Sequence, residues 1–99
     1  MDIGGFFVLN ASIALQILPL GTQERLATID GVIAYLKSRH PDVVVTPFET
    51  VIEGDYEELM ATLKGAIELA GKDCDNVFAN VKINYGRILS IAEKIDQYT

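Results

Sequence analysis

The chain has 99 residues, a formal net charge of -6, 49% hydrophobic residues and one cysteine. This length allows one domain with a single core but not two. The composition excludes a disordered chain, and the scarcity of Lys and Arg argues against a nucleic-acid surface, which needs clustered positive charge. We therefore expect one globular domain, residues 1–99, that binds neither nucleic acid nor membrane.

The single cysteine, Cys74, excludes an internal disulfide and is typical of a protein in a reducing compartment. The apolar stretch from Phe6 to Leu20 has no basic residue before it, and Asn10, Ser12 and Gln16 interrupt it. We interpret this stretch as a strand rather than a targeting or membrane segment, and we expect a cytoplasmic location.

Two long segments alternate in the manner of strands. In residues 6–18 the odd-numbered positions from 7 to 17 are all apolar and should face the helices, whereas the even-numbered positions are mixed. This run is roughly twice the length of a typical strand, so we expect a bulge or an overhang. The second long strand is predicted from Val77 to Leu89, with an interruption at Gly86-Arg87.

A helix is predicted from a cap at Thr22 to Arg39, because apolar residues recur at spacings of three and four. These apolar positions are Leu26, Ile29, Ile33 and Leu36. Pro41 prevents continuation, which makes His40 a helix-end residue rather than a catalytic or metal-binding one.

A second helix should begin at Asp55, with acidic residues in its first turn, and should end at a left-handed Gly71. A short terminal helix is predicted from Ser90 to Tyr98, anchored by Ile91 and Ile95. Between the two long helices, Asp42 to Gly54 should form two strands that meet near Pro47, because proline within a strand run marks an edge or a bulge.

The predicted order is strand, helix, strand, strand, helix, strand. It indicates an α+β, ferredoxin-like βαββαβ fold: an antiparallel four-stranded sheet with two helices on one face and a short C-terminal helix. The other face of such a sheet would expose apolar side chains among polar ones. We therefore expect a homo-oligomer, a dimer or a tetramer.

Residues Thr46 to Asp55, with the sequence TPFETVIEGD, resemble the thiamine-binding protein family. Ala11-Ser-Ile13 and Leu18-Pro19 in the first strand, Val81-Lys-Ile83 in the last strand, and Glu93-Lys-Ile95 extend this resemblance over nearly the whole chain. This resemblance implies a ferredoxin-like fold and oligomers assembled through the sheets. It also implies binding of thiamine or its hydroxymethylpyrimidine moiety without any chemical conversion of the ligand. Phe48 stands where the family usually has Met, and Glu49 where it usually has a small residue.

Such a ligand combines a flat aminopyrimidine with a cationic thiazolium. Asn10, Ser12, Gln16 and Thr50 could pair with the pyrimidine edge. Glu49 or Glu53 could meet the exocyclic amine or balance the positive charge, and Phe48 could stack on a ring. The candidate ligand-binding residues are therefore Asn10, Ser12, Gln16, Thr46, Phe48, Glu49, Thr50 and Glu53.

Plainer interpretations of these residues stay open. Glu53 could simply end a strand before the second helix, Ser12 and Asn10 could bond across an oligomer interface, and Phe48 could be a core or interface residue. Lys82 is interpreted as the partner of a nearby acid or as a solvated side chain.

We expect a binding protein rather than an enzyme, with no cofactor and no bound metal, because the chain lacks a nucleophile relay and ligands at metal-binding spacing. The alternatives are a small cofactor-free enzyme of the ferredoxin-like dimer type and a structural or regulatory oligomer without a vitamin ligand.

Overall fold

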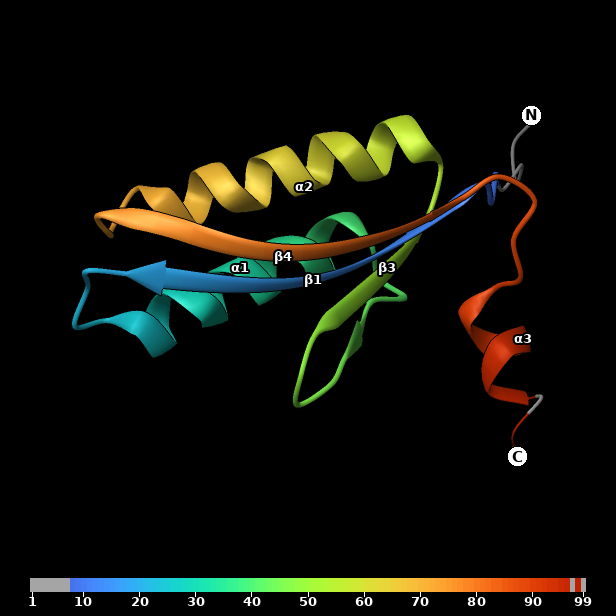
Figure 1. Ribbon diagram of the computed structural model, residues 1–99, viewed down its shortest axis with the longest axis horizontal. Coiled ribbons are helices and arrows are strands. Elements are labelled where there is room, and N and C mark those ends of the chain that lie inside the picture. Colours follow the sequence, from blue (N-terminus) through green and yellow to red (C-terminus); the bar gives the residue numbers. More distant parts are fainter. Residues whose placement is uncertain (1–7, 97, 99) are drawn as a thin grey trace.

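The first strand, β1 (Ala11–Leu20), lies inside an antiparallel sheet in the computed structural model, which describes residues 8–96 and 98 (Figure 1). The sheet has the order β2-β3-β1-β4. Its other strands are β2 (Val44–Val45), β3 (Thr50–Gly54) and β4 (Asn76–Tyr85). Helix α1 (Arg25–Arg39) follows β1, and helix α2 (Tyr56–Gly71) follows β3. The predicted α+β, ferredoxin-like arrangement is therefore confirmed.

The alternation predicted for the first strand holds over the described residues. Ala11, Ile13, Leu15 and Ile17 are buried beneath the helices, whereas Gln16 on the opposite face is exposed. The strand begins at residue 11, later than predicted, and Phe6 and Phe7 lie outside the described residues. Just before the strand, the Asn10 amide donates to the Gly54 carbonyl beside the Ala11–Gly54 pair, so two residues oppose one, as in a β-bulge.

The core continues into both long helices. On α2 the buried side chains recur every three or four residues, and α1 adds two more; these are Val32, Leu36, Leu59, Thr62, Leu63, Ala66 and Ala70. Asp55 caps α2, because its carboxylate accepts the Glu58 amide at 3.1 Å. Gly54, at φ +150°, turns the chain from β3 into this cap, a conformation that favours glycine.

Three helix-end predictions are wrong. Thr22 accepts the Glu24 amide in a preceding turn, and α1 starts only at Arg25. Leu26 is 75% exposed, so it is not one of the core positions that the helical spacing predicted. At the end of α2, Gly71 is still helical and Lys72 keeps right-handed angles, so no left-handed glycine stops this helix.

The short helix α3 (Ile91–Asp96) lies away from α1 and α2, beyond the end of the sheet where β4 finishes (Figure 1). Ser90 and Glu93 cap it reciprocally, with the Ser90 amide donating to Glu93 and the Glu93 amide donating to the Ser90 hydroxyl. These bonds hold the pKa of the Glu93 carboxyl below its usual range. Ile91 is half-buried but Ile95 is exposed, so only the first of the two predicted anchors is covered.

Residues 42–54 form the predicted pair of strands. Val44 and Val45 pair with Val51 and Thr50, and the turn between them contains Thr46, Pro47 and Phe48. Because β3 is half as long as β1, this hairpin covers only the first half of β1. Among the described residues, every helix is too short or too polar to cross a membrane.

Candidate functional site

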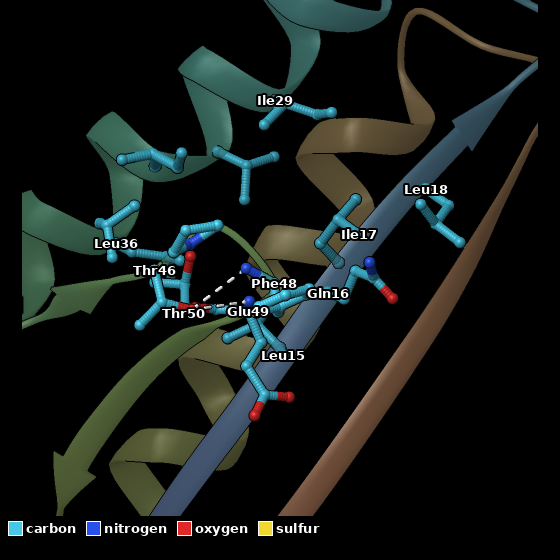
Figure 2. Close-up of a pocket in the computed structure, with 14 residues that line it drawn as sticks. Leu15, Gln16, Ile17, Leu18, Ile29, Leu36, Thr46, Phe48, Glu49 and Thr50 are labelled. Atoms are coloured by element: carbon cyan, nitrogen blue, oxygen red, sulfur yellow. Dashed lines mark hydrogen bonds between the residues drawn. The ribbon is translucent and has the colours of Figure 1, made fainter.

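A pocket of about 190 Å³ opens where the short hairpin leaves the second half of β1 uncovered (Figure 2). Its inner wall is the apolar face of α1, formed by Ile29, Val32, Ile33 and Leu36. Residues 15–18 of β1 form its floor, and residues 45–50 of the hairpin form its outer wall. The result is a narrow apolar slot with a polar rim on one side.

Thr46 fixes the shape of the outer wall. Its hydroxyl accepts the amides of Phe48 and Glu49, at 3.2 and 3.0 Å, and donates to the Glu49 carbonyl at 2.7 Å. Its own amide also donates to that carbonyl. A threonine side chain that bonds to the backbone within three residues stabilises a tight turn. The turn leaves the Phe48 ring 81% exposed at the rim of the pocket.

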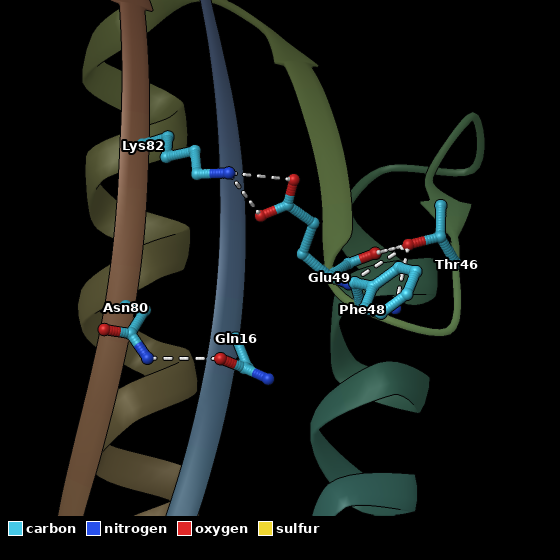
Figure 3. Close-up of polar contacts among 6 residues, drawn as sticks. All are labelled: Gln16, Thr46, Phe48, Glu49, Asn80 and Lys82. Carbon is cyan, nitrogen blue, oxygen red and sulfur yellow. Dashed lines mark hydrogen bonds and ion pairs between the residues drawn. The ribbon is translucent and has the colours of Figure 1, made fainter.

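Two polar contacts cross the open face of the sheet next to the pocket (Figure 3). Lys82 on β4 reaches over β1 and forms an ion pair with Glu49, at 3.4 Å to the nearer carboxylate oxygen. Asn80 donates to the Gln16 side chain at 3.1 Å. The expectation that Lys82 is the partner of an acid is therefore confirmed, and Glu49, the one carboxylate among the lining residues of this pocket, is already paired.

Five of the eight candidate ligand-binding residues line this pocket, namely Gln16, Thr46, Phe48, Glu49 and Thr50. Thr50 is buried and faces the helices, which is why it reaches the slot from the sheet side. Glu49 and Gln16 approach from the opposite face, at the edge of β1 (Figure 2). The sequence motif thus gathers side chains from both faces of the sheet around one opening.

The other three candidates lie elsewhere. The Asn10 side chain accepts the Tyr56 amide at 2.7 Å, which fixes the start of α2. Ser12 pairs with Glu53 across the sheet, and the Glu53 carboxylate accepts the Ile91 amide at 2.8 Å at the start of α3. A niche shared by Thr50 and Glu53 does not form, because residues three apart in a strand point to opposite faces.

Glu53 lines a second, larger pocket of about 520 Å³ at the other end of β3. Its walls include His40 and the charged side chains of Arg39, Asp42, Asp55 and Glu58. The His40 ring bonds to the buried Thr62 hydroxyl at 2.9 Å. Burial, and secondly the neighbouring Arg39, lowers the pKa of His40 from its ordinary value of 6.5. Over the described part of the chain, no three His, Cys, Asp or Glu side chains are grouped so that they could hold a metal ion.

Sequence reasoning missed the α1 wall of the first pocket, because it treated Ile29 and Ile33 as ordinary core positions. Both are only half-buried, and both line the slot. The signal that could have revealed them is the difference in length between the two predicted strands, since a short hairpin cannot cover a long neighbour. The lining residues include no histidine, cysteine or lysine, so the slot offers packing, hydrogen bonds and one paired carboxylate.

Comparison with known proteins places this chain among relatives. The profile of a family described as thiamine-binding protein matches residues 13–99. The chain belongs to the thiamine-binding protein family. A UPF0045 protein of Clostridium perfringens, 32% identical over 92 residues that cover 90% of this chain and 97% of that protein, is a further relative.

Solved structures of similar proteins support the fold of this thiamine-binding protein family member. A Streptococcus pneumoniae protein is 61% identical, with a TM-score of 0.75, over 88% of this chain and 98% of that one. A candidate thiamine biosynthesis or salvage protein from Thermotoga maritima is 22% identical, with a TM-score of 0.78, over 91% of this chain and 99% of that one. At that identity, the second likeness concerns the fold alone.

Proposed function

We propose that this protein binds thiamine or its hydroxymethylpyrimidine moiety, without converting it, in the slot between α1, β1 and the hairpin. The observation that carries this proposal is the arrangement of the slot. Its apolar walls suit the faces of a flat ring, and its rim brings together Gln16, Thr46 and Thr50 as hydrogen-bonding groups. Membership of the thiamine-binding protein family supports the choice of ligand.

The volume of the slot favours one enclosed ring. Pockets that enclose drug-sized ligands hold about 300–1,000 Å³, and this slot holds about 190 Å³. We infer that the pyrimidine enters the slot, whereas a thiazolium ring would remain at the rim beside Glu49 and Phe48. There the exposed Phe48 ring could stack on the cation, a contact that contributes about 0.5–2 kcal/mol.

The proposal includes self-association. The open face of the sheet shows Leu20 and Phe78, both exposed, among polar side chains such as Asn80 and Lys82. A second copy of the chain packed on this face would cover the apolar groups and would lie beside the rim of the slot. A dimer or tetramer, a cytoplasmic location and the lack of catalysis all stay predictions.

Calorimetry tests the proposal directly. Thiamine, thiamine phosphates and free hydroxymethylpyrimidine are titrated in parallel into the purified protein. We expect saturable heat for at least one of them below about 1 mM, which corresponds to about 4 kcal/mol of binding free energy. The Ile33→Phe variant should fill the slot and abolish this heat, whereas Leu26→Phe, on the exposed first turn of the same helix, should bind as the parent does.

The structural or regulatory oligomer without a vitamin ligand is the competing function. The exposed apolar groups on the open face favour it as much as they favour a ligand-binding oligomer. An oligomer that gives no saturable heat with any of the three ligands would select this alternative and reject the vitamin proposal.

A further inference from the structure

Strand β1 has a neighbour on both sides for only half of its length. Its pairing with β3 ends at Leu15, opposite Thr50, whereas its pairing with β4 continues to Leu20, opposite Asn76. Over the described residues, the segment from Gln16 to Leu20 therefore has a free edge on the β3 side. That edge is the floor of the slot, which Gln16, Ile17 and Leu18 line.

The direction of the peptide groups along β1 follows from bonds at its two ends. The Asn10 carbonyl accepts the Gly86 amide, and the Leu20 carbonyl accepts the Asp75 amide, so carbonyls of even-numbered residues point toward β4 and its flanks. In an antiparallel strand, N–H and C=O groups point to alternate sides from one residue to the next. The N–H and C=O groups of the odd-numbered residues must then point toward β3 and, past its end, toward the slot.

Pro19 agrees with this assignment. It lies opposite Val77 in the β1–β4 pairing, and a proline can occupy a paired strand only where its missing N–H is not needed for the ladder. Ile17 is two residues before Pro19, so its backbone groups point to the same side of the strand, away from β4. Ile17 thus directs both an N–H donor and a C=O acceptor at the slot, with no described residue of this chain bonded to either.

This free pair of backbone groups lies at a buried residue. Ile17 is only 8% exposed, and buried backbone donors and acceptors are nearly always hydrogen-bonded in folded proteins. Ile17 therefore presents one hydrogen-bond donor beside one acceptor to a slot whose walls are apolar. A flat heterocycle that carries an amino group beside a ring nitrogen presents the complementary pattern along one edge.

We propose that the free edge of β1 at Ile17 binds the amino and ring-nitrogen edge of an aminopyrimidine, in the way that an open sheet edge pairs with an added strand. The amino group donates to the Ile17 carbonyl, and the ring nitrogen accepts the Ile17 amide. This inference rests on the proposed function and specifies the ligand class, because the ring nitrogen beside the amino group must carry no proton if it is to accept that hydrogen bond.

Backbone amide exchange measured by NMR tests the contact at the atom concerned. The uniformly labelled protein is titrated with 4-amino-5-hydroxymethyl-2-methylpyrimidine. We expect exchange of the Ile17 amide to slow by about tenfold or more at saturation. The Ile13 amide, which already lies between β1 and β3, should change little and serves as the internal control.

A ligand pair and a variant pair supply the second readout. An analogue with a methyl group in place of the amino group should bind about two- to tenfold more weakly, the effect of one net hydrogen bond. Ile17→Pro removes the N–H on the side away from β4, and Ile17→Ala removes similar packing but keeps the N–H. Once circular dichroism shows both variants folded, the proline variant should bind both ligands more weakly than the alanine variant, because only proline lacks the amide that the ring nitrogen needs. The ratio between the two ligands should stay as in the parent, because proline keeps the carbonyl that accepts the amino group.

The outcomes separate this inference from the proposed function. Saturable binding with unchanged exchange at Ile17 would overturn the backbone contact and leave the vitamin proposal intact. An Ile17 amide protected without ligand, and increasingly so at higher protein concentration, would assign the edge to strand pairing between copies and would also overturn it. No saturable binding of any pyrimidine would reject both proposals together.

Discussion

Glu49 and Glu53 lie four residues apart on the same side of the sheet, and their carboxylates have different partners. Glu49 stands at the rim of the slot and pairs with Lys82, whereas Glu53 accepts the Ile91 amide at the start of α3. At the residue scale, the role of a carboxylate therefore depends more on its position along the strand than on its chemical type. Of these two carboxylates, only Glu49 lines the slot, where it can balance the positive charge of a ligand.

Glu49→Gln should weaken thiamine binding more than binding of the neutral pyrimidine, because it removes the one carboxylate near the cation. An exposed charge pair contributes about 0.2–1 kcal/mol, which is at most about a fivefold change in Kd. Lys82→Met should have the opposite effect, because it frees the Glu49 carboxylate. Calorimetry with both ligands measures the ratio, and Glu53→Gln is the control; equal losses for the two ligands in Glu49→Gln would contradict the prediction.

His40 should make stability depend on pH. Its pKa is lowered in the folded state by burial and by Arg39, so the unfolded chain binds a proton at higher pH than the folded one. The contribution of His40 is fully present above its ordinary pKa of 6.5 and is lost as the pH falls below that value. Urea unfolding of the parent and of His40→Gln at pH 7.5 and 5.5 measures this effect. The loss of stability on acidification should be smaller in the variant, and an identical loss would exclude His40 as a cause.

At the scale of elements, α1 and α2 meet through a tyrosine packed on a glycine. The Tyr35 ring lies against Gly65, where an added Cβ would be 2.9 Å from the ring carbon that bears the hydroxyl and closer still to the oxygen. The Arg39 guanidinium lies over the same ring, 5.9 Å from its centroid. Glycine is unfavourable in helices, so its presence at position 65 is explained by the close approach of the tyrosine.

Gly65→Ala should therefore destabilise the protein, by about 1–3 kcal/mol, because the overpacked contact outweighs the gain in helix propensity. Gly31→Ala, in α1, is the matched control, since a Cβ there meets nothing within 4 Å. It should stabilise the protein by about 0.5–1 kcal/mol. Free energies of unfolding from urea titration give both values, and a stabilised Gly65→Ala variant would show that Tyr35 moves aside without cost.

At the scale of the whole molecule, the two faces of the sheet differ in cover. The helices bury the β1 and β3 side chains on one face, although Ile83 and Tyr85 of β4 stay exposed there. The other face carries the Lys82–Glu49 and Asn80–Gln16 contacts and the exposed ring of Phe78. The same uncovered side includes the rim of the slot. Association through this face would therefore also determine how a ligand reaches the rim.

The protein should migrate as a dimer or tetramer in size-exclusion chromatography with light scattering. Phe78→Glu should shift it toward the monomer, because the substitution puts a charge at the centre of the proposed contact. Leu26→Glu changes an exposed leucine on α1 instead and should leave the mass unchanged. A parent protein that is monomeric at the highest concentration reached would rule out this contact.

The sequence by itself determined which face of β1 and which face of α2 is buried. Alternation in β1 and the spacing of apolar residues in α2 are local patterns with periods of two and 3.6 residues, so they can be read without the fold. The order of these elements then indicated one antiparallel four-stranded sheet. Pro47 also located the turn, because proline interrupts a strand wherever the strand lies.

Only the tertiary structure decided where each strand ends relative to its neighbours and which distant side chains meet. The free edge at Ile17 exists because β3 stops at Thr50, opposite Leu15, while β4 continues to Leu20 on the other side. The pairing of Glu49 with Lys82, 33 residues away, and the exposure of Leu26 likewise depend on which neighbour is present in space. Such contacts between distant segments leave no local period in the sequence, so the candidate site could be predicted from it only in part.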